Sequence, residues 1–168
     1  MTIKGTAVVA ALAALVGALV AVPALADVQN LVRGGGVQVS VPAGWSAVEP
    51  ADGRSTTDPR TLLVVGTKGA RPIESRCQVA SYRVPNDGAV VVVIGWRDSF
   101  GDTPTLQLSK LRRPTFECFS GRGAAGQVTR RGRDYQVSVM VGDAADAETV
   151  AAALAVARSF QLVPRKPA

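Results

Sequence analysis

One apolar run constrains the fold of this chain more than any other feature. Residues 89–96 (AVVVVIGW) are rich in β-branched side chains and follow the turn sequence PNDG at 85–88. A run of this length between turn residues is typical of a strand buried on both faces, and it is far too short to cross a membrane. We therefore expect residues 89–96 to form the central strand of a sheet.

Further strands are predicted on both sides of this run. Alternating or continuous apolar patterns occur at residues 37–41, 61–67, 77–84, 116–119, 127–129 and 135–141. The PNDG turn predicts a hairpin between 77–84 and 89–96, and residues 130–133 connect a second hairpin. The glycine-rich residues 120–126 are expected to form a turn. Residues 97–114 lack a clear period, and loops of this length are usually functional or disordered.

One helix is expected, near the C-terminus. Asp143 or Asp146 can cap its N-terminus, where Glu148 suits the helix dipole. Its apolar residues recur at helical spacing in one narrow stripe, comprising Val150, Ala153, Leu154, Ala157 and Phe160. Residues 162–163 are expected to add an edge strand. These patterns predict an α+β fold, with a single antiparallel sheet of about five to seven strands and the C-terminal helix packed on one face.

The first 26 residues have the order of a secretory signal. Lys4 is their only charge, an apolar run follows, and the segment ends in Ala-Leu-Ala. This order predicts cleavage between Ala26 and Asp27, and a secreted or extracytoplasmic protein. The alternative is an N-terminal membrane anchor, because residues 6–26 are long enough to cross a bilayer.

The remainder has the length of one domain. We expect residues 27–36 to be a flexible lead-in, residues 37–163 a single α+β domain and residues 164–168 a disordered tail. Removal of the signal takes away only Lys4, which leaves 18 basic and 13 acidic residues. This balance weakly favours acidic partners.

Cys77 and Cys118 are the only cysteines, and the chain has no histidine. An even cysteine count in an exported protein predicts one disulfide. In the chain-entropy model, closing this loop of about 41 residues stabilises the fold by about 4 kcal/mol. The lack of histidine excludes Ser-His-Asp and Cys-His nucleophile systems and imidazole metal sites. We expect neither a metal nor a cofactor.

Basic residues concentrate late in the chain. The candidate anion-binding residues are Lys110, Arg112 and Arg113 in the long segment, with Arg130, Arg131 and Arg133 in the second hairpin connection. Together, these six would favour an anionic envelope polymer or lipid surface; the alternative is that they are solvated turn charges. Arg122 is expected at the opposite end of the sheet from residues 130–133. No nucleic-acid-binding motif accompanies the basic residues, so nucleic acid is not an expected partner.

Other patterns have ordinary structural interpretations. Residues 121–126 match G-x-G-x-x-G, but β structure follows them where a dinucleotide site needs a helix. The carboxylate pairs Glu49 with Asp52 and Asp98 with Asp102 could serve glycoside hydrolysis, but they lie in polar loops where acidic residues are common. Trp45 and Trp96 are candidates for a shared ligand shelf, with core packing as the alternative.

Two segments carry a resemblance to a known family. Residues 37–45 (VQVSVPAGW) resemble the opening strand and P-x-G-W of PsbP-like domains and of related small exported actinobacterial proteins without assigned function. Residues 155–162 (AVARSFQL) are similar to their closing helix and strand. The resemblance implies an antiparallel sheet flanked by helices, and a binding or accessory role. It carries over no functional residue.

The sequence thus favours an exported, non-enzymatic binding or accessory module of the cell envelope, whose ligand stays open. Two alternatives remain: a hydrolase that uses carboxylates alone, and an inhibitor or partner of another secreted protein. A convergent carboxylate pair in a cleft would favour the first, and a flat exposed apolar patch the second.

Overall fold

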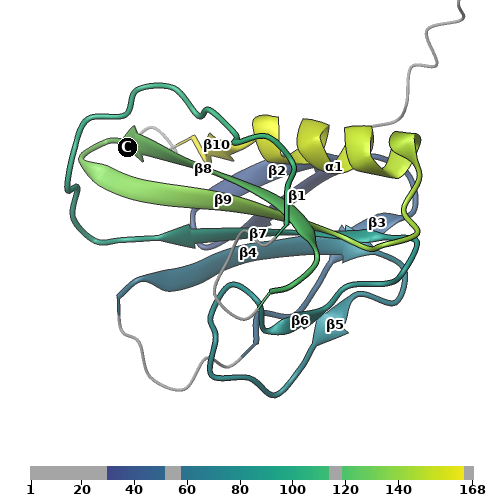
Figure 1. Cartoon of the computed structure of the whole chain (residues 1–168). Coiled ribbons are helices and arrows are strands. Elements are labelled where there is room, and N and C mark those ends of the chain that lie inside the picture. The colour runs from purple at the N-terminus through teal and green to yellow at the C-terminus, as the bar shows by residue number, and fades with distance from the viewer. Residues whose placement is uncertain (1–29, 52–57, 114–118, 165–168) are drawn as a thin grey trace, which may run out of the picture.

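The computed structural model describes residues 30–51, 58–113 and 119–164 (Figure 1). This part of the chain is mostly β structure, with one helix near the C-terminus, and all of its strand pairs are antiparallel. The strands form three sheets, of five, three and two strands. The single sheet that we expected from the sequence is therefore wrong, because both faces of the largest sheet are apolar and each needs its own cover.

The five-stranded sheet is the centre of the fold. Its strands, in spatial order, are β3 (Trp45–Ala47), β4 (Arg60–Thr67), β7 (Ala89–Gly95), β9 (Arg133–Val141) and β8 (Arg122–Arg130). Every residue of β7 is buried, which confirms the prediction of a central strand. Successive side chains of a strand point to opposite faces, so β7 sends Val91 and Val93 into one core and Val90 and Val92 into another.

The three-stranded sheet and the helix cover the first face. β1 (Asn30–Gly34), β2 (Val37–Val41) and β10 (Gln161–Leu162) form that sheet, and α1 (Ala147–Arg158) packs against β7, β9 and β2 (Figure 1). Asp146 caps α1, because its carboxylate accepts a 2.7 Å hydrogen bond from the Thr149 amide. The buried side chains of α1 are Ala153, Val156 and Ala157, so the helix approaches the sheet through small residues.

The second face is covered by shorter elements. β5 (Arg71–Pro72) and β6 (Tyr82–Arg83) form the two-stranded sheet on the side opposite α1 (Figure 1). The buried ring of Tyr82 belongs to the second core, and its hydroxyl accepts a 3.0 Å hydrogen bond from the Ala51 amide. Burial raises the pKa of the Tyr82 phenol. The expected hairpin of 77–84 with 89–96 is wrong, because β4 and β9 occupy both edges of β7.

Two further expectations about local structure are corrected. Residues 30–34, expected in a flexible lead-in, form β1, which turns into β2 through Gly35 and Gly36 at φ angles of 55° and 81°. The residues expected as a glycine-rich turn at 120–126 mostly belong to β8, which pairs with β9 along its whole length. Glycine is tolerated there because a neighbouring segment approaches the strand closely: a Cβ at Gly126 would lie 2.6 Å from the carbonyl oxygen of Gln107.

That neighbouring segment, residues 103–113, is here called the strap. It runs along the outer edge of β8, where the Ser109 amide donates to the Ala125 carbonyl at 2.8 Å and Arg112 pairs with Gly123. At its other end, the Thr129 amide donates to the Thr103 carbonyl. Its leucines (Leu106, Leu108 and Leu111) pack against the first core. The longest segment without sequence periodicity is therefore an ordered cover for a sheet edge.

The β8–β9 turn offers a test of this backbone geometry. Arg131 and Gly132 have φ angles of 51° and 70°, the pattern of a two-residue type I′ turn, which favours Asn-Gly. We expect Arg131→Asn to raise the free energy of unfolding by about 0.5–1 kcal/mol, because asparagine tolerates positive φ better than arginine does. Denaturant unfolding of the two proteins measures the change. Arg131→Val, which is strained at positive φ, is expected to be less stable than the natural chain.

Candidate functional site

The six predicted anion-binding residues do not form one cluster. Arg112 pairs with Gly123 near the start of β8, whereas the connection that holds Arg131 closes the far end of that strand. The strand from Gly123 to Arg130 spans about 23 Å at about 3.3 Å per residue. Lys110, Arg112 and Arg113 are therefore separated from Arg130, Arg131 and Arg133, and the two groups lie at opposite ends of β8.

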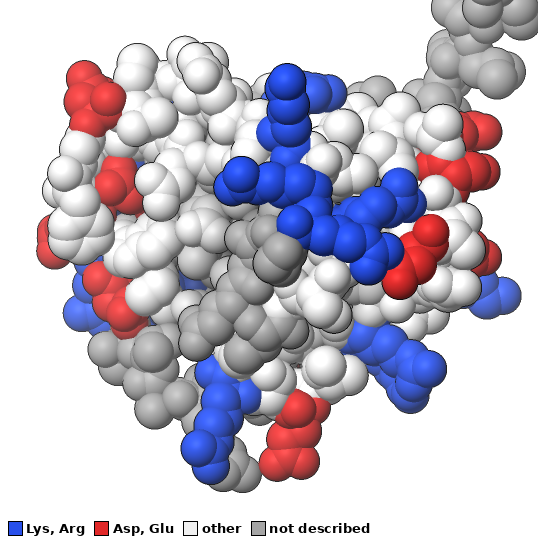
Figure 2. Space-filling view, viewed as in Figure 1, with Lys and Arg blue, Asp and Glu red and all other residues white. Residues whose placement is uncertain are grey.

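The first group forms a basic surface with a residue that we had set apart from the candidates. Lys110, Arg112 and Arg113 are exposed on the strap, and Arg122 is half-buried at the start of β8 beside them. Figure 2 shows basic side chains gathered over the middle of this face, with an acidic side chain next to them. We call Lys110, Arg112, Arg113 and Arg122 the strap surface.

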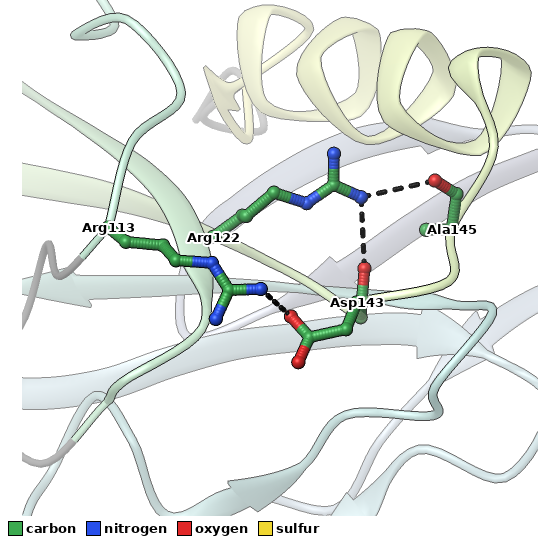
Figure 3. Close-up of polar contacts among 5 residues, drawn as sticks. Arg113, Arg122, Asp143 and Ala145 are labelled. Carbon is green, nitrogen blue, oxygen red and sulfur yellow. Dashed lines mark hydrogen bonds and ion pairs between the residues drawn. The ribbon is translucent and has the colours of Figure 1, made fainter.

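The two innermost arginines of the strap surface are oriented by the loop that precedes α1 (Figure 3). Arg113 forms an ion pair with the exposed carboxylate of Asp143. Arg122 donates from one Nη atom to the carbonyl oxygens of Gly142 and Ala145, both at 3.1 Å. Its Nε is buried and lacks a hydrogen-bond partner in the described structure. The Arg122 guanidinium is therefore held in place by carbonyl groups, which carry no net charge to cancel its own.

The second group lies at the end of the sheet where β8 and β9 are joined. Arg130 is tied down, because its guanidinium donates to the carbonyl oxygens of Pro104 and Thr129. Arg133 lines two adjoining hollows of about 460 and 440 Å³, which also share Gly35 and Tyr135. We call the two hollows together the hairpin cleft. The other charged residues that line it are Asp58, Arg60, Arg97, Asp98 and Arg131.

The two tryptophans do not form a shared shelf. Trp45 pairs with Thr67 at one end of β4, whereas Gly95, which precedes Trp96, pairs with Arg60 at the other. Trp45 also packs against the first core and Trp96 against the second. Trp96 does line the hairpin cleft, so one of the two tryptophans predicted to bind a ligand lies at a hollow.

The described members of the predicted carboxylate pairs lie at the surface, and most of the glycine motif lies in a strand. Asp98 and Asp102 are both exposed, and Asp52, the predicted partner of Glu49, lies outside the described residues. Residues 121–126 continue into β8 rather than into a helix, as expected. No group of three or more potential metal ligands occurs in the part of the chain that the structure describes.

Sequence reasoning missed an ordered carboxylate beside the hairpin cleft. Asp134 accepts hydrogen bonds from the Thr129 hydroxyl at 2.6 Å, the Phe100 amide at 2.8 Å and the Ser99 hydroxyl at 3.0 Å. The hydrogen bond from the Thr129 hydroxyl has the largest effect on this carboxylate and lowers the pKa of Asp134 from 3.8. The hydrogen bonds from Phe100 and Ser99 lower it further. We call this arrangement the Asp134 clamp, and it fixes the chain that leaves Trp96 along the cleft.

Comparison of the chain with protein-family models, curated proteins and solved structures finds no match. The resemblance to PsbP-like domains is therefore neither supported nor contradicted. Within residues 30–51, 58–113 and 119–164, no helix is long and apolar enough to cross a membrane. The predicted signal, its alternative as an anchor, and Cys118 all fall outside those residues.

The Asp134 clamp predicts a local, acid-sensitive loss of order. The folded-state pKa is depressed, so the stabilisation by the carboxylate is present above pH 3.8 and is lost as the pH falls through the lower folded value. We expect Asp134→Asn to speed amide hydrogen exchange of residues 99–101 near neutral pH, as measured by NMR. Asp102→Asn, which changes an exposed carboxylate nearby, serves as the control. Equal exchange in the Asp134 variant and the natural chain would contradict the clamp.

Proposed function

We propose that the protein is an exported, non-enzymatic binding module of the cell envelope that attaches to an anionic polymer through the strap surface. The observation that carries the proposal is the gathering of four cations around the start of β8, where Asp143, the ion-pair partner of Arg113, is the acidic side chain beside them. Like charges held this close repel one another, and a polyanion laid across them relieves that repulsion.

The orientation of the strap surface suits an extended ligand. Its cations come from two antiparallel segments, the strap and β8, which are joined by backbone hydrogen bonds. Lys110 and Arg112 are exposed, so they can reach successive charges of a polymer without a conformational change. Arg122 is held by the carbonyl groups of Gly142 and Ala145, and it adds a half-buried charge in a fixed position to the exposed ones.

A polymer fits this surface better than a lipid bilayer does. Stable attachment to a bilayer usually adds apolar insertion to electrostatic attraction. The exposed large apolar side chains of the described residues are Leu31, Ile73 and Phe100, and none of them belongs to the strap or to β8. Among the residues that the structure describes, the strap surface therefore offers charge without an inserting side chain.

Changes of charge on the strap surface test the proposal. Lys110→Ser with Arg112→Ser removes two exposed cations, and at about 0.5 kcal/mol each we expect affinity for labelled polyphosphate to fall about fivefold. Asp143→Asn removes the competing carboxylate and is expected to tighten binding by about twofold. Fluorescence anisotropy measures both. Binding of the natural chain should weaken steeply between about 0.01 M and 1 M salt, where the Debye length falls from about 30 Å to about 3 Å.

The matched control removes the same net charge from the other end of the sheet. Arg131→Asn with Arg133→Ser is expected to leave polyphosphate binding within about twofold of the natural chain at about 0.15 M salt, because the strand that separates the two ends is about 23 Å long and the Debye length is about 8 Å. Equal losses in the two double variants would show attraction by net charge alone and would refute the proposed site. Stronger binding to phosphatidylglycerol vesicles than to polyphosphate would favour the lipid alternative.

The disulfide and the cleaved signal belong to the same proposal. Cys77 precedes β6 on the second face of the sheet, and a bond to Cys118 would tie the chain that follows the strap to that cover. Non-reducing peptide mapping of the secreted protein is expected to link these two cysteines and to give an N-terminus at Asp27. Reduction should then lower stability by about 4 kcal/mol in the chain-entropy model. Free thiols in the secreted protein would contradict the bridge.

A further inference from the structure

We propose that the hairpin cleft is a second binding site, which takes an acidic sugar unit. This site is distinct from the strap surface and does not depend on it. The inference rests on three features of the cleft: a preformed hollow, arginines that face it from several elements, and an aromatic wall with carboxylates beside it.

The cleft is preformed because its floor is tightly packed. A Cβ at Gly95 would lie 2.6 Å from Leu62 Cδ1 and 3.2 Å from Tyr135 Cδ1. The side chains of Leu62 and Tyr135 therefore pack directly against the Gly95 backbone at the floor of the cleft. A Cβ at Gly35 would lie 2.7 Å from the Cβ of Leu62, which also lines the first hollow. Tyr135 is further held by the ring of Phe160, with the ring centroids 5.4 Å apart. Each hollow, at about 460 and 440 Å³, lies within the usual range for small-molecule sites.

Arginines reach the cleft from separate parts of the chain. Arg97 follows β7, Arg131 lies in the β8–β9 turn and Arg133 begins β9. None of the three forms an ion pair with a carboxylate of the described residues. A guanidinium group has a planar fork of donors that matches a carboxylate or a phosphate. This set therefore selects for an anionic group on the ligand.

The rest of the lining suits a polyhydroxylated ring. Trp96 is half-buried and presents an apolar surface in the first hollow, on which the apolar face of a sugar ring can pack. Asp58 and Asp98 line the same hollow and can accept hydrogen bonds from sugar hydroxyl groups. The Asp58 side chain is held in place, because it accepts a 3.0 Å hydrogen bond from the Arg97 amide. Carboxylates beside arginines favour a ligand with hydroxyl groups as well as negative charge over a simple anion.

The chain offers a direct optical test. It has two tryptophans, so Trp45→Phe leaves Trp96 in the cleft as the single reporter. Titration with glucuronic acid and with glucose 6-phosphate, each up to on the order of 10 mM, is expected to give saturable changes in Trp96 fluorescence. Glucose and inorganic phosphate are the controls and should bind at least about tenfold more weakly. A response to glucuronic acid alone or to glucose 6-phosphate alone identifies the anionic group and supports the site.

Variants separate this site from the strap surface. In the Trp45→Phe background, Arg133→Ser is expected to weaken binding of the acidic sugar about tenfold or more, whereas Lys110→Ser with Arg112→Ser should leave it unchanged. Equal binding of glucose, equal binding of inorganic phosphate, no saturable response, or no effect of Arg133→Ser would each overturn the proposal. In the polyphosphate assay, the Lys110 and Arg112 double variant is expected to weaken binding and the Arg131 and Arg133 double variant is not. In the acidic-sugar assay, Arg133→Ser is expected to weaken binding and the Lys110 and Arg112 double variant is not. Either proposal can therefore fail while the other stands.

Discussion

Burial of the central strand β7 on both of its faces is the constraint on which the rest of this structure depends. Val90, Val91, Val92 and Val93 are at most 1% exposed, and burying each valine contributes about 1.5 kcal/mol or more. A sheet with two apolar faces needs two covers. The three-stranded sheet with α1 supplies one, and the shorter elements around Tyr82 supply the other. Polar and charged side chains are consequently displaced to the ends and the outer edge of the sheet.

The placement of the basic residues follows from one strand. β8 carries Arg122 at its start and Arg130 at its end, so any cation near one end is a strand length from the other. The strap runs antiparallel to β8 and delivers Lys110, Arg112 and Arg113 to the starting end. The two ends therefore have different chemistry: an open surface of cations at one, and a hollow with aromatic and acidic residues at the other.

The sequence predicted the elements that local patterns determine, and it missed the features that depend on which strands pair with one another. β7 and α1 were foreseen, because composition, caps and periodicity mark them within a few residues. Pairing of 77–84 with 89–96 was wrong, since no local signal reveals that β4 and β9 compete for the edges of β7. β1 could have been found, because Gly35-Gly36 between short polar-apolar runs is a hairpin signal. The sequence showed which basic residues the chain carries, but how they group in space required the register of β8. Arg60 and Arg97 come next to Arg133 through the pairing of β7 with β4 on one side and with β9 on the other.

The strap also affects the tendency of the protein to aggregate at high concentration. An exposed sheet edge offers unpaired amide and carbonyl groups to any other extended chain, which is a common route to aggregation. Here the strap occupies the β8 edge, and the opposite edge is β3, which is only three residues long. The cations of the strap also discourage a second copy from approaching that side. A segment without regular secondary structure thus covers the long edge of a valine-rich sheet and lowers the tendency of that edge to pair with another chain.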